Sequence, residues 1–245
     1  MLGLQLYTVR NKITDEASAV SVITQIREMG YECVQAAGDL ATIELTVRAA
    51  KKAGVAVVGM LSNIKDCEEE GERLFALARE CGAEDIGISS TIKTDSEACE
   101  LVSRVNRFAA TCKENGFTFS YHNHSNEFIR GESGKVLMQT LLDGFDPSAV
   151  YLMPDTYWLQ HGGNDVRAFL EGLTGRVRIL HLKDMKRTEQ GVTYAELGVG
   201  NINFPGILPI AERIGSRHLI VEQDICDGDP LDSARTSLAY LKSLL

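Results

Sequence analysis

Short apolar runs alternate with longer amphipathic segments along the whole chain. The segments between the runs have helical periodicity: in residues 16–30, apolar side chains recur at Val20, Ile23, Ile26 and Met29, and residues 67–82 form a second candidate helix. Glycines directly before four of the runs, in "MGY", "AGV", "CGA" and "NGF", are typical of helix ends. Eight runs have the composition of buried strands: residues 2–7, 31–37, 55–61, 85–90, 117–124, 149–155, 177–184 and 218–224.

The regular order of the strand–helix pairs predicts the fold class. Eight pairs in a row, spaced by about 30 residues, favour a parallel sheet with helical crossovers. Eight such units close into a (β/α)8 TIM barrel of the α/β class, which we expect as a single domain over residues 1–245. An open doubly wound sheet is the alternative, but no GxGxxG motif follows the first strand. Residues 185–204, after strand seven, are rich in glycine and polar residues and predict a large loop.

Charge and cysteine content narrow the class of protein. The net charge of −9 argues against a nucleic-acid partner, which normally requires a basic surface. The six cysteines show no metal-ribbon spacing, and with no signal peptide at the N-terminus they favour reduced thiols and a cytoplasmic location. The apolar runs are too short to cross a membrane, so no membrane partner is expected.

Polar residues gather where the predicted strands end, which is where TIM barrels build their active sites. Buried charges at such positions are costly without partners, and imidazoles and carboxylates that converge there can share a cation. The residues at these ends are Gln5, Tyr7, His122, His124, Asp155, His181, Lys183, Asp184, Glu222 and Asp224.

Alternation of side chains along each strand selects a ligand set from these residues. His181 and Lys183 share one face of strand seven, and Glu222 and Asp224 share one face of strand eight. The pattern predicts one divalent ion (Mn, Co, Zn, Fe or Mg) held by Asp155, His181, Glu222 and either His122 or His124. Simpler interpretations remain open residue by residue: Asp155 as a helix N-cap, His124 as a hydrogen-bonded core histidine, and Lys183–Asp184 as a surface ion pair.

Six segments in order resemble the sugar phosphate isomerase/epimerase superfamily, that is, the xylose isomerase-like TIM barrels of AP endonuclease family 2. The segments are "GLQLYTVR" at 3–10, "YHNHSNEF" at 121–128, "DTYWLQHGG" at 155–163, "HLKD" at 181–184, "ELGVGNINF" at 196–204 and "VEQD" at 221–224. The resemblance implies a divalent metal held by His122, Asp155, His181 and Glu222, with His124 facing the substrate. The chain departs from the ketose 3-epimerases, which have a glutamate in place of His122, and from many relatives in having Gln35 on strand two.

The resemblance implies chemistry on a sugar-like carbonyl compound. A metal would polarise the carbonyl and stabilise an enediolate as the α-proton leaves. We expect Glu222 to act as the base and His124 or Lys183 to return the proton or to protonate a departing hydroxyl. The expected substrate contacts are Gln5, Tyr7, Glu127, Trp158 and Arg187.

Several functions are compatible with this site. We expect a metal-dependent isomerase or epimerase acting on a small sugar, sugar phosphate or cyclitol. The alternative is a dehydratase of the inosose or dehydroshikimate type, which the histidine at position 122 favours. A third possibility is an AP-endonuclease-like repair enzyme, which would need more histidines and a basic surface. A fourth is a barrel that binds sugars without catalytic activity. The sequence leaves the substrate, the metal and any homo-oligomer open.

Overall fold

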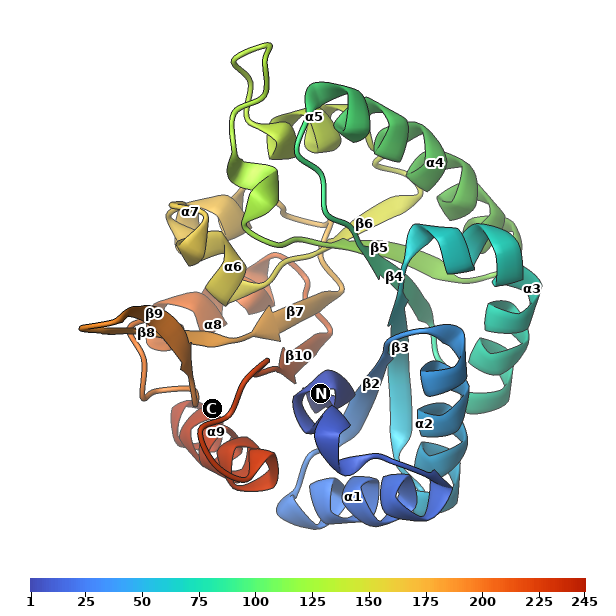
Figure 1. The fold of residues 1–245 in the computed structure, drawn as a ribbon, viewed down its shortest axis with the longest axis vertical. Helices are drawn as coiled ribbons and strands as arrows, with labels where there is room; N and C mark the ends of the chain where they lie inside the picture. The colour runs from blue at the N-terminus through green and yellow to red at the C-terminus, as the bar shows by residue number, and fades with distance from the viewer.

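Eight parallel strands form the centre of the molecule in a computed structural model that describes residues 1–245 (Figure 1). The hydrogen-bonded order is β6-β5-β4-β3-β2-β1-β10-β7, and isolated bridges from Leu152 to Val177 and from Asp155 to His181 join the two outer strands. The sheet is therefore a nearly closed TIM barrel, which confirms the predicted fold class. The strands are β1 (Leu2–Gln5), β2 (Cys33–Ala37), β3 (Ala56–Ser62), β4 (Asp85–Ser89), β5 (Thr118–His122), β6 (Val150–Met153), β7 (Ile179–Leu182) and β10 (His218–Val221).

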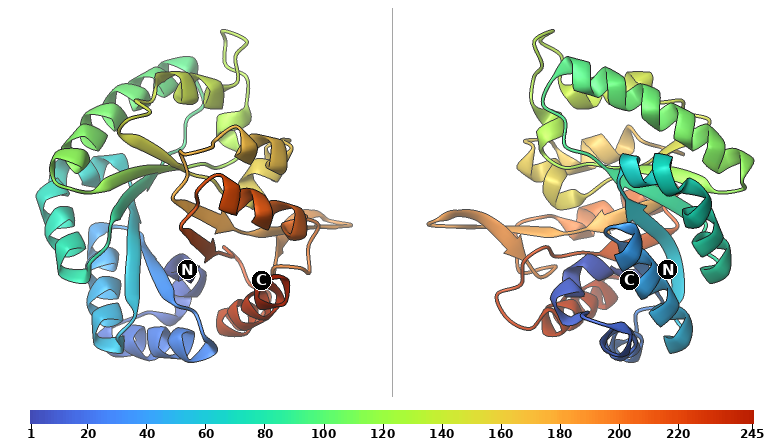
Figure 2. Two further views of the ribbon diagram at one scale, coloured as in Figure 1. Left: turned by 180° about the vertical axis from the view of Figure 1, so that it is seen from behind. Right: turned by 45° about the vertical axis from the view of Figure 1, so that its right-hand side comes forward.

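Helices surround the barrel, as the two further views show (Figure 2). The helices expected over residues 16–30 and 67–82 are α1 (Glu16–Met29) and α3 (Ile64–Cys81). Gly30, Gly54 and Gly82 end the first three helices in the left-handed region, which favours glycine. The remaining helices are α2 (Leu40–Ala53), α4 (Asp95–Glu114), α5 (Leu137–Gly144), α6 (Thr156–His161), α7 (Val166–Glu171), α8 (Phe204–Arg213) and α9 (Pro230–Leu244), with short 3-10 helices η1 (Leu6–Lys12) and η2 (Asn126–Phe128).

Apolar side chains fill both the barrel and the layer between barrel and helices. A small cluster inside the barrel includes Cys33, Met153 and Ile220, and a cluster of 65 buried residues lies mainly between strands and helices. Space inside is tight at Gly3, where a Cβ atom would lie 2.5 Å from the Ile220 Cδ1 atom. The interior is thus a packed core, and polar chemistry is confined to the strand ends.

The stretch after β7 is a β-hairpin followed by a loop. Strands β8 (Asp184–Thr188) and β9 (Gly191–Ala195) pair antiparallel and project away from the barrel (Figure 1). The carboxylate of Asp184, which is buried, accepts hydrogen bonds from the backbone N–H groups of Met185, Gly198, Gly200 and Ile202. Asp184 therefore anchors the loop, and it is not half of a surface ion pair with Lys183. The periodicity in this stretch was too weak to predict the hairpin.

The cysteines and the lengths of the helices bear on two further expectations from the sequence. All six cysteines are free. None of the helices has both the length and the apolar character required to cross a bilayer.

Candidate metal and active site

Four side chains from four neighbouring strand ends meet at one end of the barrel. They are His122 at the end of β5, Asp155 just after β6, His181 in β7 and Glu222 just after β10. Each offers one ligand atom, these atoms all lie within 4.8 Å of one another, and all four residues are buried. The structure thus brings together the set that the sequence predicted, with His122 in the cluster and His124 beside it.

The hydrogen bonds of His181 define which of its nitrogens can bind a metal. The Nε2 atom lies 2.6 Å from Gln35 Oε1, which also accepts a hydrogen bond from Gln5 Nε2 at 2.7 Å. Because Gln35 Oε1 is an acceptor, Nε2 of His181 must carry the proton. In the neutral ring, Nδ1 then directs a lone pair at Glu222 Oε2, 3.0 Å away. Two acceptors this close require a cation between them, and a proton or a metal ion can fill that role.

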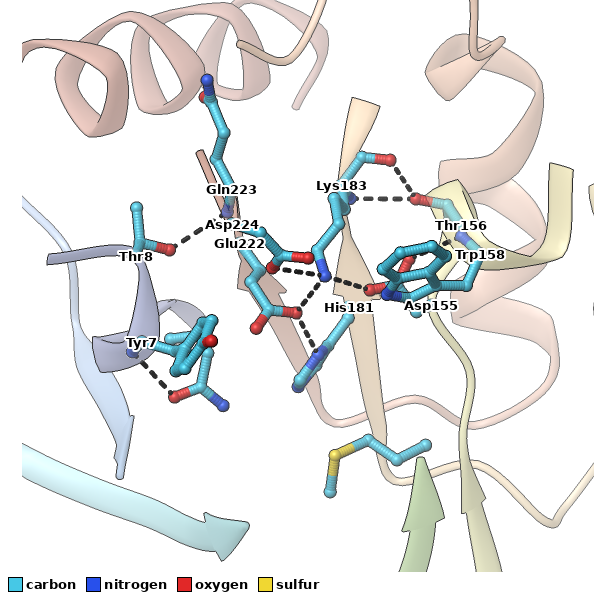
Figure 3. Close-up of polar contacts among 12 residues, drawn as sticks. Tyr7, Thr8, Asp155, Thr156, Trp158, His181, Lys183, Glu222, Gln223 and Asp224 are labelled. Atoms are coloured by element: carbon cyan, nitrogen blue, oxygen red, sulfur yellow. Dashed lines mark hydrogen bonds and ion pairs between the residues drawn. The ribbon is translucent and has the colours of Figure 1, made fainter. Parts of the chain in front are cut away.

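Lys183 lies among three carboxylates at the same end of the barrel (Figure 3). Its ammonium Nζ is 3.0 Å from Asp155 Oδ2, 2.9 Å from Glu222 Oε2 and 2.9 Å from Asp224 Oδ1. The side chain is 1% exposed, so these are buried ion pairs. Burial alone would lower the pKa of Lys183, but the three carboxylates outweigh it and hold the pKa well above its ordinary value. Lys183 therefore keeps its proton and its positive charge.

The neighbouring groups titrate in ways that suit metal binding. Burial would raise the pKa of Glu222, but Lys183 and His181 outweigh burial and hold it well below its usual range, so this carboxylate is ionised at neutral pH. Burial lowers the pKa values of His122 and His124, and for His122 the nearby His181 adds to the effect. Both imidazoles are therefore neutral at neutral pH, which is the form that binds metals.

Asp155 serves two purposes through its two oxygens. Oδ1 accepts a hydrogen bond from the backbone N–H of Trp158 and caps α6, while Oδ2 faces Lys183. The backbone N–H of Asp155 donates to Asn123 Oδ1, which ties the end of β6 to the end of β5. The N-cap interpretation and the ligand interpretation are thus both compatible with the structure, because each uses a different oxygen.

A cavity of about 330 Å³ opens onto this cluster. His122, His124, Lys183 and Glu222 reach it from the strand ends, and Tyr7, which is 40% exposed, lies at its rim. The rings of His124 and Trp158 lie 5.2 Å apart. The full lining is Tyr7, Ala37, Gly38, Leu61, Ser62, Asn63, Ser89, His122, His124, Lys183, Glu222 and Asp224.

Four of the expected substrate contacts are absent from the lining of the cavity. Trp158 lies beside the lining, with its ring 5.2 Å from the ring of His124, and the other three are held elsewhere. Gln5 is fully buried and holds Gln35. Glu127 is fully buried too, because η2 turns it back to accept hydrogen bonds from the Tyr121 hydroxyl and the His124 backbone N–H. Arg187 is exposed on β8, which carries it away from the barrel. These three expectations are corrected: Gln5 and Glu127 support other residues, and Arg187 lies outside the cavity.

Some site residues were not assigned a role from the sequence. The sequence shows Gln35 only as a departure from relatives, whereas in the structure it orients His181. Strand-end position alone does not predict that Asp224 pairs with Lys183. Ser62 and Ser89 end β3 and β4, so the strand-end rule that found the histidines could also have found them.

The donor set fits a divalent transition metal or Mg²⁺. Two imidazoles and two carboxylates form a mixed nitrogen and oxygen set. Nδ1 of His122 is buried and has no hydrogen-bond partner, so it is free to act as a ligand. Gln35 provides the outer hydrogen bond that metal-binding histidines usually have.

The chain belongs to the xylose isomerase-like TIM barrel family, because the sequence model of that family matches residues 23–244. This confirms the resemblance seen in the motifs. Among curated proteins, the chain is similar to inosose dehydratase of Mesomycoplasma hyopneumoniae (strain 7448), with 28% identity over 174 residues. That match covers 62% of this chain and 56% of the relative, so the chain spans little more than half the length of the curated relative.

Solved structures show the same fold. A structure described as a sugar phosphate isomerase/epimerase from Parabacteroides distasonis superimposes with a TM-score of 0.82 at 22% identity, over 99% of this chain and 93% of the other. The probable 3-DHS dehydratase of Bacillus anthracis superimposes with a TM-score of 0.76 at 13% identity, over 98% of each chain. At these identities the superpositions establish the fold alone.

Proposed function

We propose that this protein is a divalent-metal-dependent dehydratase. It would remove a proton next to the carbonyl of a sugar or cyclitol and then eliminate a β-hydroxyl group. One observation carries the proposal: both carboxylates that line the cavity, Glu222 and Asp224, follow the same strand, whereas β5 contributes two histidines, His122 at its end and His124 just after it. A base on each face of the substrate, as in two-glutamate epimerisation, is therefore absent from the lining. The similarity to inosose dehydratase supports the same choice.

Glu222 is the proposed base. Its carboxylate is ionised at neutral pH and lines the cavity, so it can accept the α-proton of a bound substrate. The C–H electron pair moves to the carbonyl oxygen, giving an enolate. When that pair returns, the C–O bond to the β-hydroxyl breaks, and the hydroxyl leaves as water with the proton that Glu222 had accepted.

Lys183 has a supporting part in this scheme. Its ammonium group is paired with three carboxylates, and its raised pKa keeps the proton in place. Its charge holds Asp155, Glu222 and Asp224 together and keeps Glu222 ionised. A divalent ion bound by His122, Asp155, His181 and Glu222 would supply Lewis acidity that makes the α-proton easier to remove.

Reaction in deuterium oxide tests the proposal. Metal-loaded protein is incubated with inososes and with ketoses, and the products are followed by NMR and mass spectrometry. We expect a product that has lost one water. Metal-loaded protein that gives neither dehydration nor deuterium incorporation with any polyhydroxy carbonyl compound would contradict the proposal.

An isomerase or epimerase is the second candidate. It shares the first step and differs only in that a proton returns to carbon. The observation that favours it is the buried Nδ1 of His124, which has no partner and could hold a substrate hydroxyl while the Glu222 carboxyl group returns the proton to carbon. Deuterium at carbon without loss of water would identify this outcome.

A further inference from the structure

The charged groups around the cavity are almost all negative. Glu222 and Asp224 line it, Asp155 lies directly behind Lys183, and Lys183 is the one cation among the lining residues. Three carboxylates against one ammonium leave an excess of two negative charges, which one divalent ion would neutralise without creating a positive site. The charge balance therefore provides nothing that attracts an anionic substrate.

The charge of Lys183 is already compensated within the site. Its ammonium Nζ lies 2.9–3.0 Å from oxygen atoms of three carboxylates, and a phosphate group would have to compete with all three of them. The other basic side chains in this region do not line the cavity. Arg10 stacks on the Tyr7 ring and donates to the backbone carbonyls of Tyr7 and Asp224, and Lys186 pairs with Asp227.

Helix N-termini, which often bind phosphate, are already capped at this cavity. Gly38 and Asn63 line it just before α2 and α3 begin. Asp39 caps α2 with its own carboxylate, which accepts from the Thr42 N–H at 2.8 Å. Asn63 caps α3, and Asp66 adds a negative charge in its first turn. Both positive helix ends are thus satisfied by side chains of the chain itself.

The remaining polar groups suit hydroxyl groups. The Ser62 hydroxyl and the His124 Nδ1 atom are buried without hydrogen-bond partners, and both residues line the cavity. Such groups can exchange neutral hydrogen bonds with a polyol. From this distribution we propose that the cavity admits uncharged polyhydroxy carbonyl compounds and excludes their phosphate esters. The identity of the reaction rests on the proposed function, whereas the exclusion of anions rests on the charges alone.

The single tryptophan of the chain lies beside this site and can report on it. Trp158 lies 5.4 Å from the Lys183 ammonium and 5.2 Å from the His124 ring. Its fluorescence is quenched with iodide, caesium and acrylamide. Each quenching constant is divided by the constant that the same quencher gives with free N-acetyltryptophanamide. We expect iodide to quench Trp158 at least about threefold less than acrylamide, and caesium to exceed iodide. Iodide quenching equal to or stronger than that of acrylamide would overturn the inference.

Matched sugar pairs extend the test to ligands. With the Mg²⁺-loaded protein, D-fructose is compared with D-fructose 6-phosphate and D-ribulose with D-ribulose 5-phosphate, by Trp158 fluorescence and by solvent-deuterium exchange. If either member of a pair changes the Trp158 fluorescence or exchanges deuterium, we expect the sugar phosphate to bind at least about tenfold more weakly than its parent sugar. A phosphate that binds or exchanges better than its parent sugar overturns the inference. If no pair exchanges or loses water, the proposed function fails for these sugars, and the quenching result still decides whether anions are excluded.

Discussion

The barrel buries carboxylates at both of its ends, but with different partners. At the carboxyl end, Asp155, Glu222 and Asp224 surround a lysine and adjoin two imidazoles. At the amino end, Asp85 in β4 is 3% exposed, and its Oδ2 atom accepts hydrogen bonds only from the hydroxyls of Thr118 and Ser120. Burial raises the pKa of Asp85 to about 6 despite these bonds.

The difference shows that burial alone does not make a functional site. No cation contacts Asp85, and the carboxyl group can lower the free-energy cost of its burial by taking up a proton. The carboxylates at the other end are held together by Lys183, and Glu222 remains ionised as a consequence. Burial raises the pKa of Asp155 to about 6 as well, so the two ends differ in their partners rather than in burial. A cluster of carboxylates beside neutral imidazoles has affinity for a cation, whereas a single buried carboxyl group contributes to packing.

The largest expected effect is on catalytic activity, which should depend on the carboxylate at the carboxyl end of the barrel and not on the one at the amino end. Glu222→Gln removes the proposed base and a ligand, so we expect solvent-deuterium exchange or dehydration to fall by at least about 10²-fold. Asp85→Asn is the matched control at the other end and should leave the turnover rate unchanged. Equal rates for Glu222→Gln and the unmodified protein would remove Glu222 from the chemistry.

Lys183→Met tests the charge balance at the carboxyl end. Without the ammonium, three buried carboxylates repel one another, and we expect a loss of about 3–5 kcal/mol in the free energy of unfolding at pH 8 without metal. The loss should shrink when millimolar Mn²⁺ is added, because the ion binds only the folded protein. Lys186→Met, on the exposed β8, serves as control. An unaltered urea transition for Lys183→Met would show that the ion pairs do not stabilise the fold.

Asp85→Asn tests the amino end through the pH dependence of stability. The folded pKa of about 6 exceeds the unfolded value of 3.8, so the folded state binds more protons between these values. Stability from this group is present at low pH and is lost as pH rises through 6. From pH 4 to 7 we expect the unmodified protein to lose about 2 kcal/mol relative to the variant. Parallel stability curves for the two proteins would contradict the assigned pKa.

Gln35 sharpens the comparison, because it links the core to the metal ligands. Gln35→Met leaves the His181 Nε2–H group without an acceptor, and we expect Mn²⁺ affinity to fall by about tenfold. Gln35→Glu keeps an acceptor and should retain most of the affinity. Calorimetric titration with Mn²⁺ measures both, and equal affinity for Gln35→Met and the unmodified protein would show that this hydrogen bond is dispensable.

Much of the fold and the ligand set could be predicted because both depend on strand ends. Alternation located the eight strands, and the rule for parallel barrels then placed Asp155, His181, Glu222 and one of His122 and His124 together; the family resemblance favoured His122. The surroundings were harder to predict. Glu127 turns inward through η2, and Arg187 leaves with the hairpin, because local turns and hairpin pairing have weak periodic patterns. The three partners of Lys183 come from two other strand ends, and sequence spacing does not specify such distances.

Cobalt titration tests most directly whether His122, Asp155, His181 and Glu222 hold one metal ion. Metal-free protein is titrated with Co²⁺, and the visible d–d absorption and the heat of binding are recorded for the unmodified protein and for a His181→Ala, Asp155→Ala double variant. Circular dichroism confirms that the variant is folded. We predict one Co²⁺ per chain in the unmodified protein and none at this site in the variant. An unmodified protein that binds no Co²⁺, or a folded variant with the same absorption and stoichiometry, would contradict the metal site.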